Sequence, residues 1–195
     1  MLGLQTQRVM QRRMDVAANN LANVSTNGFK ADALLTEVAD GGRARSAEMP
    51  RDVRFVRDVG DMRDFSQGAI RQTGEPFDVA LRGEGFFLVS DPQLGTLYTR
   101  DGAFQLNDAG ELVTKDGRNV LNSGGAPIVF DPQGEQPVID SEGAISIGGS
   151  EVGRIGVVNF ANPAALEKVG ANAFNAKGQA TTAFEGSVAQ GAIES

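Results

Sequence analysis

The chain has 195 residues and a formal net charge of −7, and it contains neither cysteine nor histidine. This length suffices for one domain, or one domain with an appendage, and the acidic balance argues against a general nucleic-acid-binding protein. Without Cys and His there is no thiol nucleophile, disulfide framework, Cys/His zinc site or Ser-His-Asp triad.

The chain begins with a predicted helix of coiled-coil type in a segment that covers 1–28. Apolar residues recur at alternating intervals of four and three, the spacing of a seam that packs on one or two other helices. These residues are Met10, Met14, Ala17, Leu21 and Val24. Asn27 and Gly28 favour the left-handed backbone that ends a helix. Packing of this helix on its own domain is the alternative.

Residues 29–64 are predicted to form a linker that leads into an edge strand. Arginines alternate with Asp and Glu over 43–64 and nearly balance them, which is typical of a solvated segment. Val53, Phe55 and Val59 indicate a strand with one buried face.

Residues 65–174 are predicted to form a β-rich body of short antiparallel strands and hairpins, so the fold class is mainly β. Glycine is abundant, with 25 residues in the chain, and this favours tight turns. Asp101-Gly102 and Asp116-Gly117 each lie between alternating apolar residues, which is a strong hairpin signal.

The later part of the chain gives weaker signals. Strands are predicted at 127–130, 144–147 and 154–160, and a short helix at 163–169, with a proline at its start and a glycine after its end. Residues 175–195 are small and polar and are predicted to be a return segment with few anchors.

Motifs for catalysis or ligand binding are weak. The sequence GEGF at 83–86 lacks the third glycine of a dinucleotide fingerprint and leads into a strand. The acids of 58–64 lack the spacing and the closing Glu of a calcium loop. We therefore expect no catalytic, cofactor-binding or metal-binding residues. A carboxylate-based hydrolase and a small β-rich ligand-binding module are the alternatives, although no cluster of polar residues indicates a site.

Three segments resemble one protein family. Residues 17–32, AANNLANVSTNGFKAD, resemble the signature ANNLANVNTTGFK of bacterial flagellar rod and hook proteins. Residues 65–121, with TGEPFDVAL and YTRDGAF, resemble the central body of that family, and 158–174 with QGAIE at 190–194 resemble its later part. The three segments follow the family's order, and they are most similar to its proximal-rod member, with the distal-rod member as the alternative.

The resemblance implies a structural protein without catalysis. Such proteins are exported unfolded through the flagellar export apparatus without a cleaved signal peptide. They assemble helically, with copies of themselves and with other rod proteins, into the periplasmic rod of the basal body, which transmits motor torque. Neither nucleic-acid binding nor direct membrane insertion is expected, and no stretch reaches the roughly 20 apolar residues that span a bilayer.

The resemblance also implies which residues interact. In the family the N-terminal helix pairs with a C-terminal helix, and the pairs line the rod. The implied subunit-interaction residues are the seam residues Met10, Met14, Ala17, Leu21 and Val24, together with Asn19, Asn20 and Asn23, whose amides would bond to neighbouring helices or backbones. Gly28 and Phe29 would mark a hinge between helix and body, since Gly28 can take a positive φ and Phe29 could anchor the chain on the body.

Family members continue beyond QGAIES with a further segment and the C-terminal helix. That helix lies outside the 195 residues given, so we expect the seam to lack an intramolecular partner. It would then be frayed or covered by a neighbouring chain.

Overall fold

The computed structural model describes residues 2–23, 26–41 and 53–195, which form two compact units. The first unit, called the arm below, comprises residues 1–24 and 30–64, and the second, called the body, comprises 25–29 and 65–195. The chain therefore leaves the arm after the helix, contributes five residues to the body, and returns to the arm before the body resumes at Phe65.

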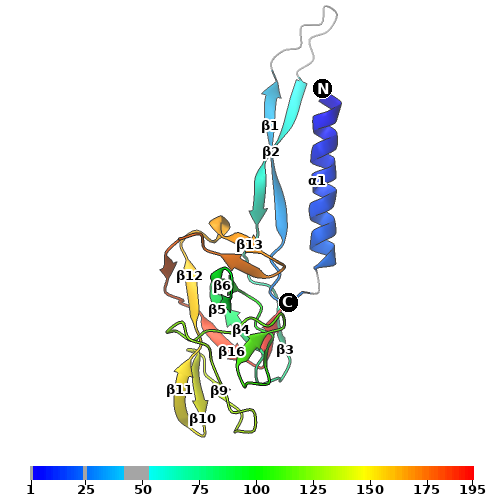
Figure 1. The fold of residues 1–195 in the computed structure, drawn as a ribbon. Coiled ribbons are helices and arrows are strands. Elements are labelled where there is room, and N and C mark those ends of the chain that lie inside the picture. The colour runs from blue at the N-terminus through cyan, green and yellow to red at the C-terminus, as the bar shows by residue number, and fades with distance from the viewer. Residues whose placement is uncertain (1, 24–25, 42–52) are drawn as a thin grey trace, which may run out of the picture. The chain divides into compact units, whose positions relative to one another are not determined.

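The described residues of the arm form one helix and one pair of long antiparallel strands (Figure 1). Helix α1, Leu2–Ala22, runs beside the strands β1, Asp32–Gly41, and β2, Val53–Arg63. The two strands pair antiparallel, with a register shift between Leu35 and Thr36. The predicted helix is present, and it ends where the backbone N–H of Asn23 donates to the carbonyl of Asn19 at 3.1 Å. Val24 and residues 43–52 of the charged segment lie outside the described residues.

The body is built from short antiparallel strands, which confirms the mainly β fold class. The largest sheet has six strands in the order β13-β14-β6-β5-β12-β15. Its strands are β5 Phe86–Asp91, β6 Gly95–Thr99, β12 Val157–Phe160, β13 Glu167–Val169, β14 Ala173–Asn175 and β15 Thr181–Thr182. A second sheet, in the order β11-β10-β9, comprises β9 Val138–Ile139, β10 Ala144–Ile147 and β11 Ser150–Arg154.

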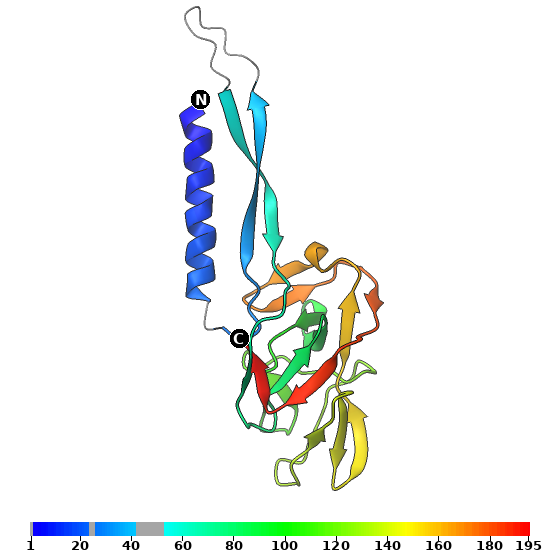
Figure 2. The same ribbon diagram turned by 180° about the vertical axis from the view of Figure 1, so that it is seen from behind.

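Three strand pairs complete the body, and two of them join its first strands to its last (Figure 2). These pairs are β3 Ile70–Gln72 with β17 Ala192–Glu194, β4 Val79–Arg82 with β16 Ser187–Gln190, and β7 Phe104–Leu106 with β8 Leu112–Thr114. In the described part of the chain, no helix is both long and apolar enough to cross a membrane.

The core of the body contains two groups of buried apolar side chains. The larger group includes Val79, Leu81, Phe87, Leu97, Leu112, Val120 and Ile145. The smaller group is aromatic: Phe174 is fully buried, and its ring centroid lies 5.3 Å from that of Phe65 and 5.9 Å from that of Phe86, both edge-on. Edge-to-face packing is the arrangement that aromatic rings favour, so these rings join strands that are distant in sequence.

One of the two predicted hairpins is confirmed and the other is wrong. At Asp116-Gly117, Gly117 has φ +85° and the N–H of Thr114 donates to the carbonyl of Arg118 at 2.9 Å, which closes a tight turn. At Asp101-Gly102 the flanking strands do not pair, because β6 lies between β5 and β14. The chain instead continues into β7, which pairs with β8 in a separate sheet, and the carbonyl of Gly102 accepts a bond from Val79 N at 2.9 Å.

The end of the chain is better anchored than its composition predicts. The segment 175–195 contributes β15, β16 and β17, and Ala192, Ile193 and Glu194 are all buried. Its buried residues are Val188, Ala192, Ile193 and one acid, Glu194, and they give no long apolar run in the sequence. The helix predicted at 163–169 is a single 3₁₀ turn, Pro163–Ala165, followed by β13. The strand predicted at 144–147 is confirmed as β10.

Candidate subunit-interaction surface

Helix α1 presents two different sides. At 3.6 residues per turn, Val9, Val16 and Asn20 share one side, and the seam residues share another side about 120° away. Val9, Val16 and Asn20 are half-buried, whereas the seam residues from Met10 to Leu21 are exposed. The half-buried side is the one attached to the rest of the arm.

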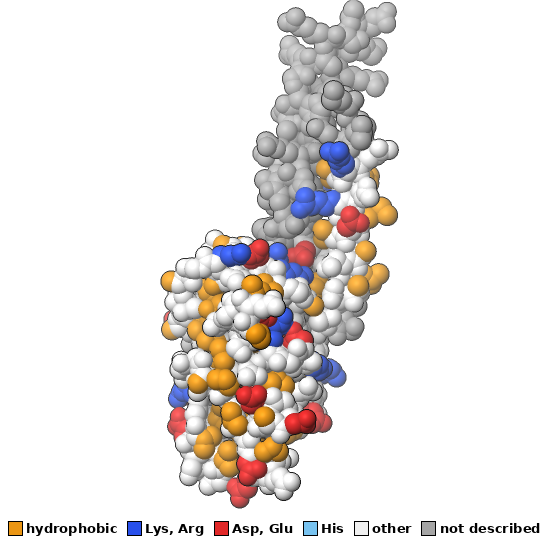
Figure 3. Space-filling view, viewed as in Figure 1, with side chains coloured by type: hydrophobic (Ala, Val, Ile, Leu, Met, Phe, Trp, Pro, Cys, Tyr) orange, Lys and Arg blue, Asp and Glu red, His pale blue; other side chains and the backbone are white. Residues whose placement is uncertain are grey.

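The exposed side is an apolar stripe, defined here as Met10, Met14, Ala17 and Leu21. Met10 is 60% exposed, Met14 71% and Leu21 74%. Figure 3 shows hydrophobic side chains at the surface along α1. Isolated exposed apolar residues are common, but four on one side of a helix form a continuous strip. Burying a Leu or Met side chain is worth roughly 1.5–3 kcal/mol, so the stripe favours contact with another apolar surface.

Asn20 attaches α1 to the start of β1. Its amide nitrogen Nδ2 donates to the carbonyl of Asp32 at 2.8 Å, and the N–H of Asp32 donates back to Oδ1 at 3.1 Å. The carboxylate of Asp32 in turn accepts from Arg63 Nε at 3.0 Å, across the β1–β2 pair. These bonds occupy the amide of Asn20 inside the arm.

The other two asparagines lie at the end of α1. Nδ2 of Asn23 donates to the carbonyl of Asn19 at 2.9 Å, so this side chain satisfies one of the last helical carbonyls. The Asn19 side chain is exposed. The structure therefore places Met10, Met14, Ala17 and Leu21 together, and the asparagines apart from them.

The sequence analysis did not identify the side formed by Val9, Val16 and Asn20. A signal for it exists, because these residues are separated by seven and four positions, which also places them on one side of a helix. The more regular spacing of the seam obscured it.

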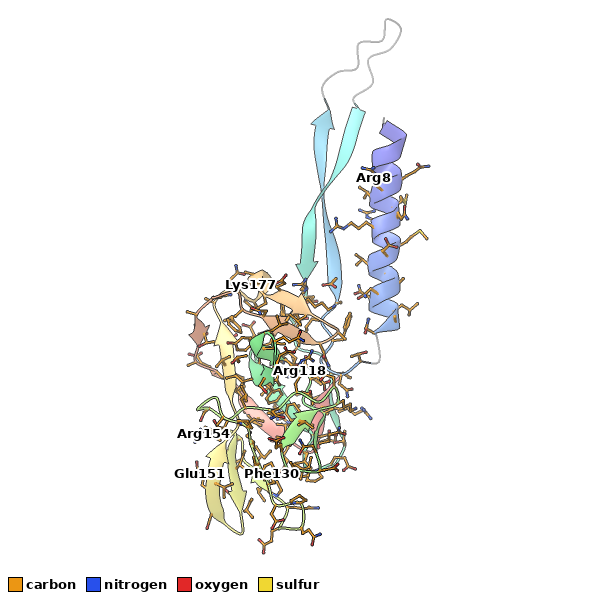
Figure 4. All side chains as sticks on the ribbon, viewed as in Figure 1. Arg8, Arg118, Phe130, Glu151, Arg154 and Lys177 are labelled. Atoms are coloured by element: carbon orange, nitrogen blue, oxygen red, sulfur yellow. The ribbon has the colours of Figure 1, made fainter. Side chains whose placement is uncertain are left out.

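The charges on α1 are mostly positive. Arg8, labelled in Figure 4, is followed by Arg12 and Arg13, and Asp15 is the only acid between Leu2 and Ala22. The chain as a whole has a net charge of −7. A basic helix on an acidic chain favours an approach to acidic surfaces at long range.

Gly28 lies where the chain crosses the body between α1 and β1. It is buried, has φ +63°, and donates its N–H to the backbone carbonyl of Glu194 at 2.9 Å. A Cβ at this position would lie 2.4 Å from the backbone nitrogen of Asp101, so only glycine fits without displacement. The next residue, Phe29, has the ammonium of Lys168 4.5 Å from its ring centroid, a cation–π distance.

The described residues of the body form no comparable candidate site. No group of three or more acids is placed to hold a metal there. One cavity of ≈ 360 Å³ lies between residues 127–131 and the strands β10 and β11, and its lining includes Phe130 and Arg154 (Figure 4). Burial raises the pKa of Asp101, whose carboxylate accepts bonds from Ala103 N at 3.0 Å and Asn172 Nδ2 at 2.7 Å. These bonds fix a turn of the backbone.

Comparison with known proteins gives consistent matches. Residues 3–30 match the family described as flagella basal body rod protein, and 80–147 match the flagellar hook protein FlgE/F/G D1 domain. The flagellar basal-body rod protein FlgF of Caulobacter vibrioides is 36% identical over 173 residues, which cover 89% of this chain and 70% of that relative.

Two further relatives give similar values. FlgF of Mesorhizobium japonicum is 33% identical over 82% of this chain and 64% of its own length. The flagellar basal-body rod protein FlgG of Bacillus subtilis is 34% identical over 88% of this chain and 70% of its own length. The chain thus spans between 64% and 70% of the length of these three relatives.

A helical arm with an exposed apolar stripe and a β-rich body, both matched by flagellar families, define a structural protein and not an enzyme. The chain belongs to the flagellar basal-body rod protein family. It is a FlgF-like structural subunit of the rod, and membership of the family implies that it assembles with rod proteins in the basal body.

Proposed function

We propose that the chain is a proximal-rod subunit that assembles helically with copies of itself and with other rod proteins to transmit motor torque. The observation that carries this proposal is the apolar stripe on α1. One side of the helix is held to β1 through Asn20, while Met14 and Leu21 on the stripe are more than two-thirds exposed. A stripe with intervals of four and three is completed by another helix.

In this proposal the apolar stripe is covered by a helix of a neighbouring rod subunit or by a C-terminal helix of the kind found in the family. A surface that meets a different surface on the next subunit produces an open helical assembly when the rotation does not close into a ring. Torque would then be shared among many such contacts. Gly28 and Phe29 would form the joint through which the body transmits it to the helix.

We expect charged substitutions in the stripe to abolish assembly. The double variant Met14→Glu, Leu21→Glu places two charges in the proposed contact, whereas Gln11→Glu adds one charge at an exposed position about a quarter of a turn away. Sedimentation across a concentration range, with and without a peptide of the C-terminal helix of a FlgF relative, measures assembly of each form.

The proposal predicts that Gln11→Glu associates like the unaltered chain and that the double variant stays monomeric. Thermal unfolding of the whole chain checks that both variants are folded. If the double variant associated at the same concentration as the unaltered chain, the stripe would not be the subunit contact.

A distal-rod role is the second candidate, because the identity to FlgG of Bacillus subtilis, 34%, lies between the identities to the two FlgF relatives, 36% and 33%. Expression of the gene in strains that lack FlgF or FlgG distinguishes the proximal-rod role from the distal-rod role. Restored swimming in the FlgF-deficient strain alone supports the proximal rod.

Export through the flagellar apparatus without cleavage is also part of the proposal, and it is supported by the family resemblance of α1. Appearance of the intact N-terminus outside the cytoplasm, and its loss in cells without the export apparatus, would support this route.

A further inference from the structure

The body contains a buried ion pair between residues that lie 94 positions apart, Arg100 and Glu194. Their side chains are only 3% and 1% exposed. Nη2 and Nε of Arg100 donate to the same carboxylate oxygen, Oε2, at 2.6 and 2.9 Å. Burying two charges is costly unless their hydrogen-bonding groups are satisfied, so the remaining bonds of this pair are informative.

Those remaining bonds reach two other segments. Nη1 of Arg100 donates to the carbonyls of Gly83 and Gly85, at 2.7 and 2.8 Å, in the connection between β4 and β5. The second carboxylate oxygen, Oε1, accepts from the N–H of Gly68 at 2.9 Å, just before β3. Both oxygens of Glu194 therefore accept from N–H donors.

The backbone of Glu194 adds the segment that crosses from α1. Its carbonyl accepts from the N–H of Gly28, and Gly28 also lies against the backbone of Arg100 and Asp101. Next to it, the N–H of Ser195 donates to Ala69 O at 2.9 Å. The first segment of the body, 25–29, and its last strand, β17, are thus held at one point.

The strand pairing alone is short at this point. β17 pairs with β3 over three residues, and a ladder of that length can open one bond at a time from its end. The side-chain bonds of Arg100 and Glu194 cross-link it to segments outside the ladder. Separation of β17 from the body then requires several charge-assisted bonds to break together. Segment 25–29 depends on β17, because the N–H of Gly28 donates to the backbone carbonyl of Glu194.

We propose that the Arg100–Glu194 pair is a mechanical clasp that keeps segment 25–29 and strand β17 in fixed register on the body, so that load applied to the body is not released by the detachment of one of them. Arg100 and Glu194 are positioning residues in this role. The inference rests on the proposed torque-transmitting function, but the state of the clasp can be measured in the isolated chain.

The first test is Glu194→Gln, which preserves shape and removes the charge. Whichever way the amide is turned, its NH₂ group must face a donor, either Gly68 N or Arg100, so one side of the clasp opens. Hydrogen exchange of the full chain reports on this directly. We expect the amides of Gly28, Gly68 and Ser195 to exchange faster by about tenfold or more, with little change at Leu112 and Val120, which lie deep in the core.

The matched control is Asp91→Asn, which breaks the Arg118–Asp91 ion pair of the same body at a half-buried position. It is expected to leave exchange at Gly28 and Gly68 unchanged. Arg100→Lys is a milder second variant that keeps the charge but lacks the planar, multiple-donor guanidinium, and it should accelerate exchange at the same three amides.

Two results would overturn the inference. Unchanged exchange at Gly28 in Glu194→Gln would show that the pair does not hold segment 25–29. Equal acceleration at Leu112 and Val120 would show a general contribution to core stability instead of a local clasp. Neither measurement depends on assembly, so failure of the proposed rod function is scored separately, by sedimentation of the unaltered chain.

A test under load follows for cells that assemble the Glu194→Gln subunit. The clasp predicts that swimming of these cells falls more steeply than that of unaltered cells as medium viscosity rises. An identical viscosity dependence in the presence of accelerated exchange at Gly28 would overturn the mechanical role.

Discussion

At the scale of the residue, Gly28 combines a left-handed backbone with a close approach to another segment. Gly95 has a similar φ, +76° against +63°, but a Cβ there would meet nothing within 4 Å. A substitution at Gly95 therefore measures the free-energy cost of the left-handed backbone alone, whereas one at Gly28 adds the cost of the contact with Asp101. Sequence reasoning identified the positive φ of Gly28 as accessible, but the neighbour that excludes a side chain comes from a segment far along the chain.

We predict that Gly95→Ala lowers the free energy of unfolding of the body by about 1 kcal/mol, the cost of a left-handed alanine. Gly28→Ala should lower it further, because the methyl group must displace the backbone of Asp101. Urea denaturation measures both. An equal decrease in the free energy of unfolding for the two variants would show that segment 25–29 can move away from Asp101 without loss of stability.

Asp101 gives a pH-dependent prediction. Burial raises its pKa above the ordinary value of 3.8, while bonds from Ala103 and Asn172 lower it only in part. For an acid with a raised folded pKa, the neutral form is favoured in the folded chain. The contribution of Asp101 to the free energy of unfolding is therefore fully present below pH 3.8 and is lost as pH rises through the folded pKa.

Asp101→Asn has no such titration. We expect the unfolding free energy of the variant, relative to the unaltered chain, to rise as pH increases from about 3 to 6. Denaturation at a series of pH values tests this. The series is needed because the difference in unfolding free energy at a single pH also includes the effect of the altered bond to Asn172. A difference that stays constant with pH would contradict the pKa shift.

At the scale of the element, aromatic packing connects strands that are far apart in sequence. Phe174 on β14 is fully buried and packs edge-on against Phe65 and against Phe86 on β5. Since β14 also pairs with β6, this residue lies at the junction between the largest sheet and the start of the body.

We predict that Phe174→Ala lowers the unfolding free energy of the body by about 3–5 kcal/mol. Leu94→Ala, at a half-exposed turn position, should change it by less than about 0.5 kcal/mol. Thermal or urea unfolding compares them. A loss of under about 1 kcal/mol for Phe174→Ala would mean that the aromatic group relaxes around the cavity.

Elements stabilised by nearby residues could be predicted from the sequence, and those that depend on distant partners could not. The helix, β10 and the turn at Asp116-Gly117 each follow from local periodicity or turn chemistry. The hairpin at Asp101-Gly102 failed because β6 finds its partners in β5 and in β14, about 75 residues later. The apolar stripe was visible in the helical spacing, whereas the Arg100–Glu194 pair has no local signal.

At the scale of the whole molecule, the net charge of −7 opposes association of identical subunits. Like-charge repulsion is screened within about 10 Å at 0.1 M salt, whereas apolar contacts such as the stripe do not weaken with added salt. The direction in which added salt changes assembly should therefore show whether apolar contacts or ion pairs dominate the contact between subunits.

We predict that the concentration needed for assembly falls as NaCl rises from about 20 to 200 mM. Sedimentation of the unaltered chain, with the FlgF peptide present, measures this threshold. The double variant Met14→Glu, Leu21→Glu serves as the control and should remain monomeric throughout. Dissolution of assemblies by salt would instead indicate that ion pairs hold the subunits together.

The bonds of Glu194 also have a consequence for the order in which the chain folds. Glu194 bonds to Gly68, 126 positions earlier, and to Arg100, 94 positions earlier. Contacts of such sequence separation form slowly, because a long loop must close first. While the last strand is absent, Gly28 and Gly68 have no Glu194 to bond, and Arg100 lacks its counter-ion. The body therefore reaches its native state only after nearly all of the 195 residues are available.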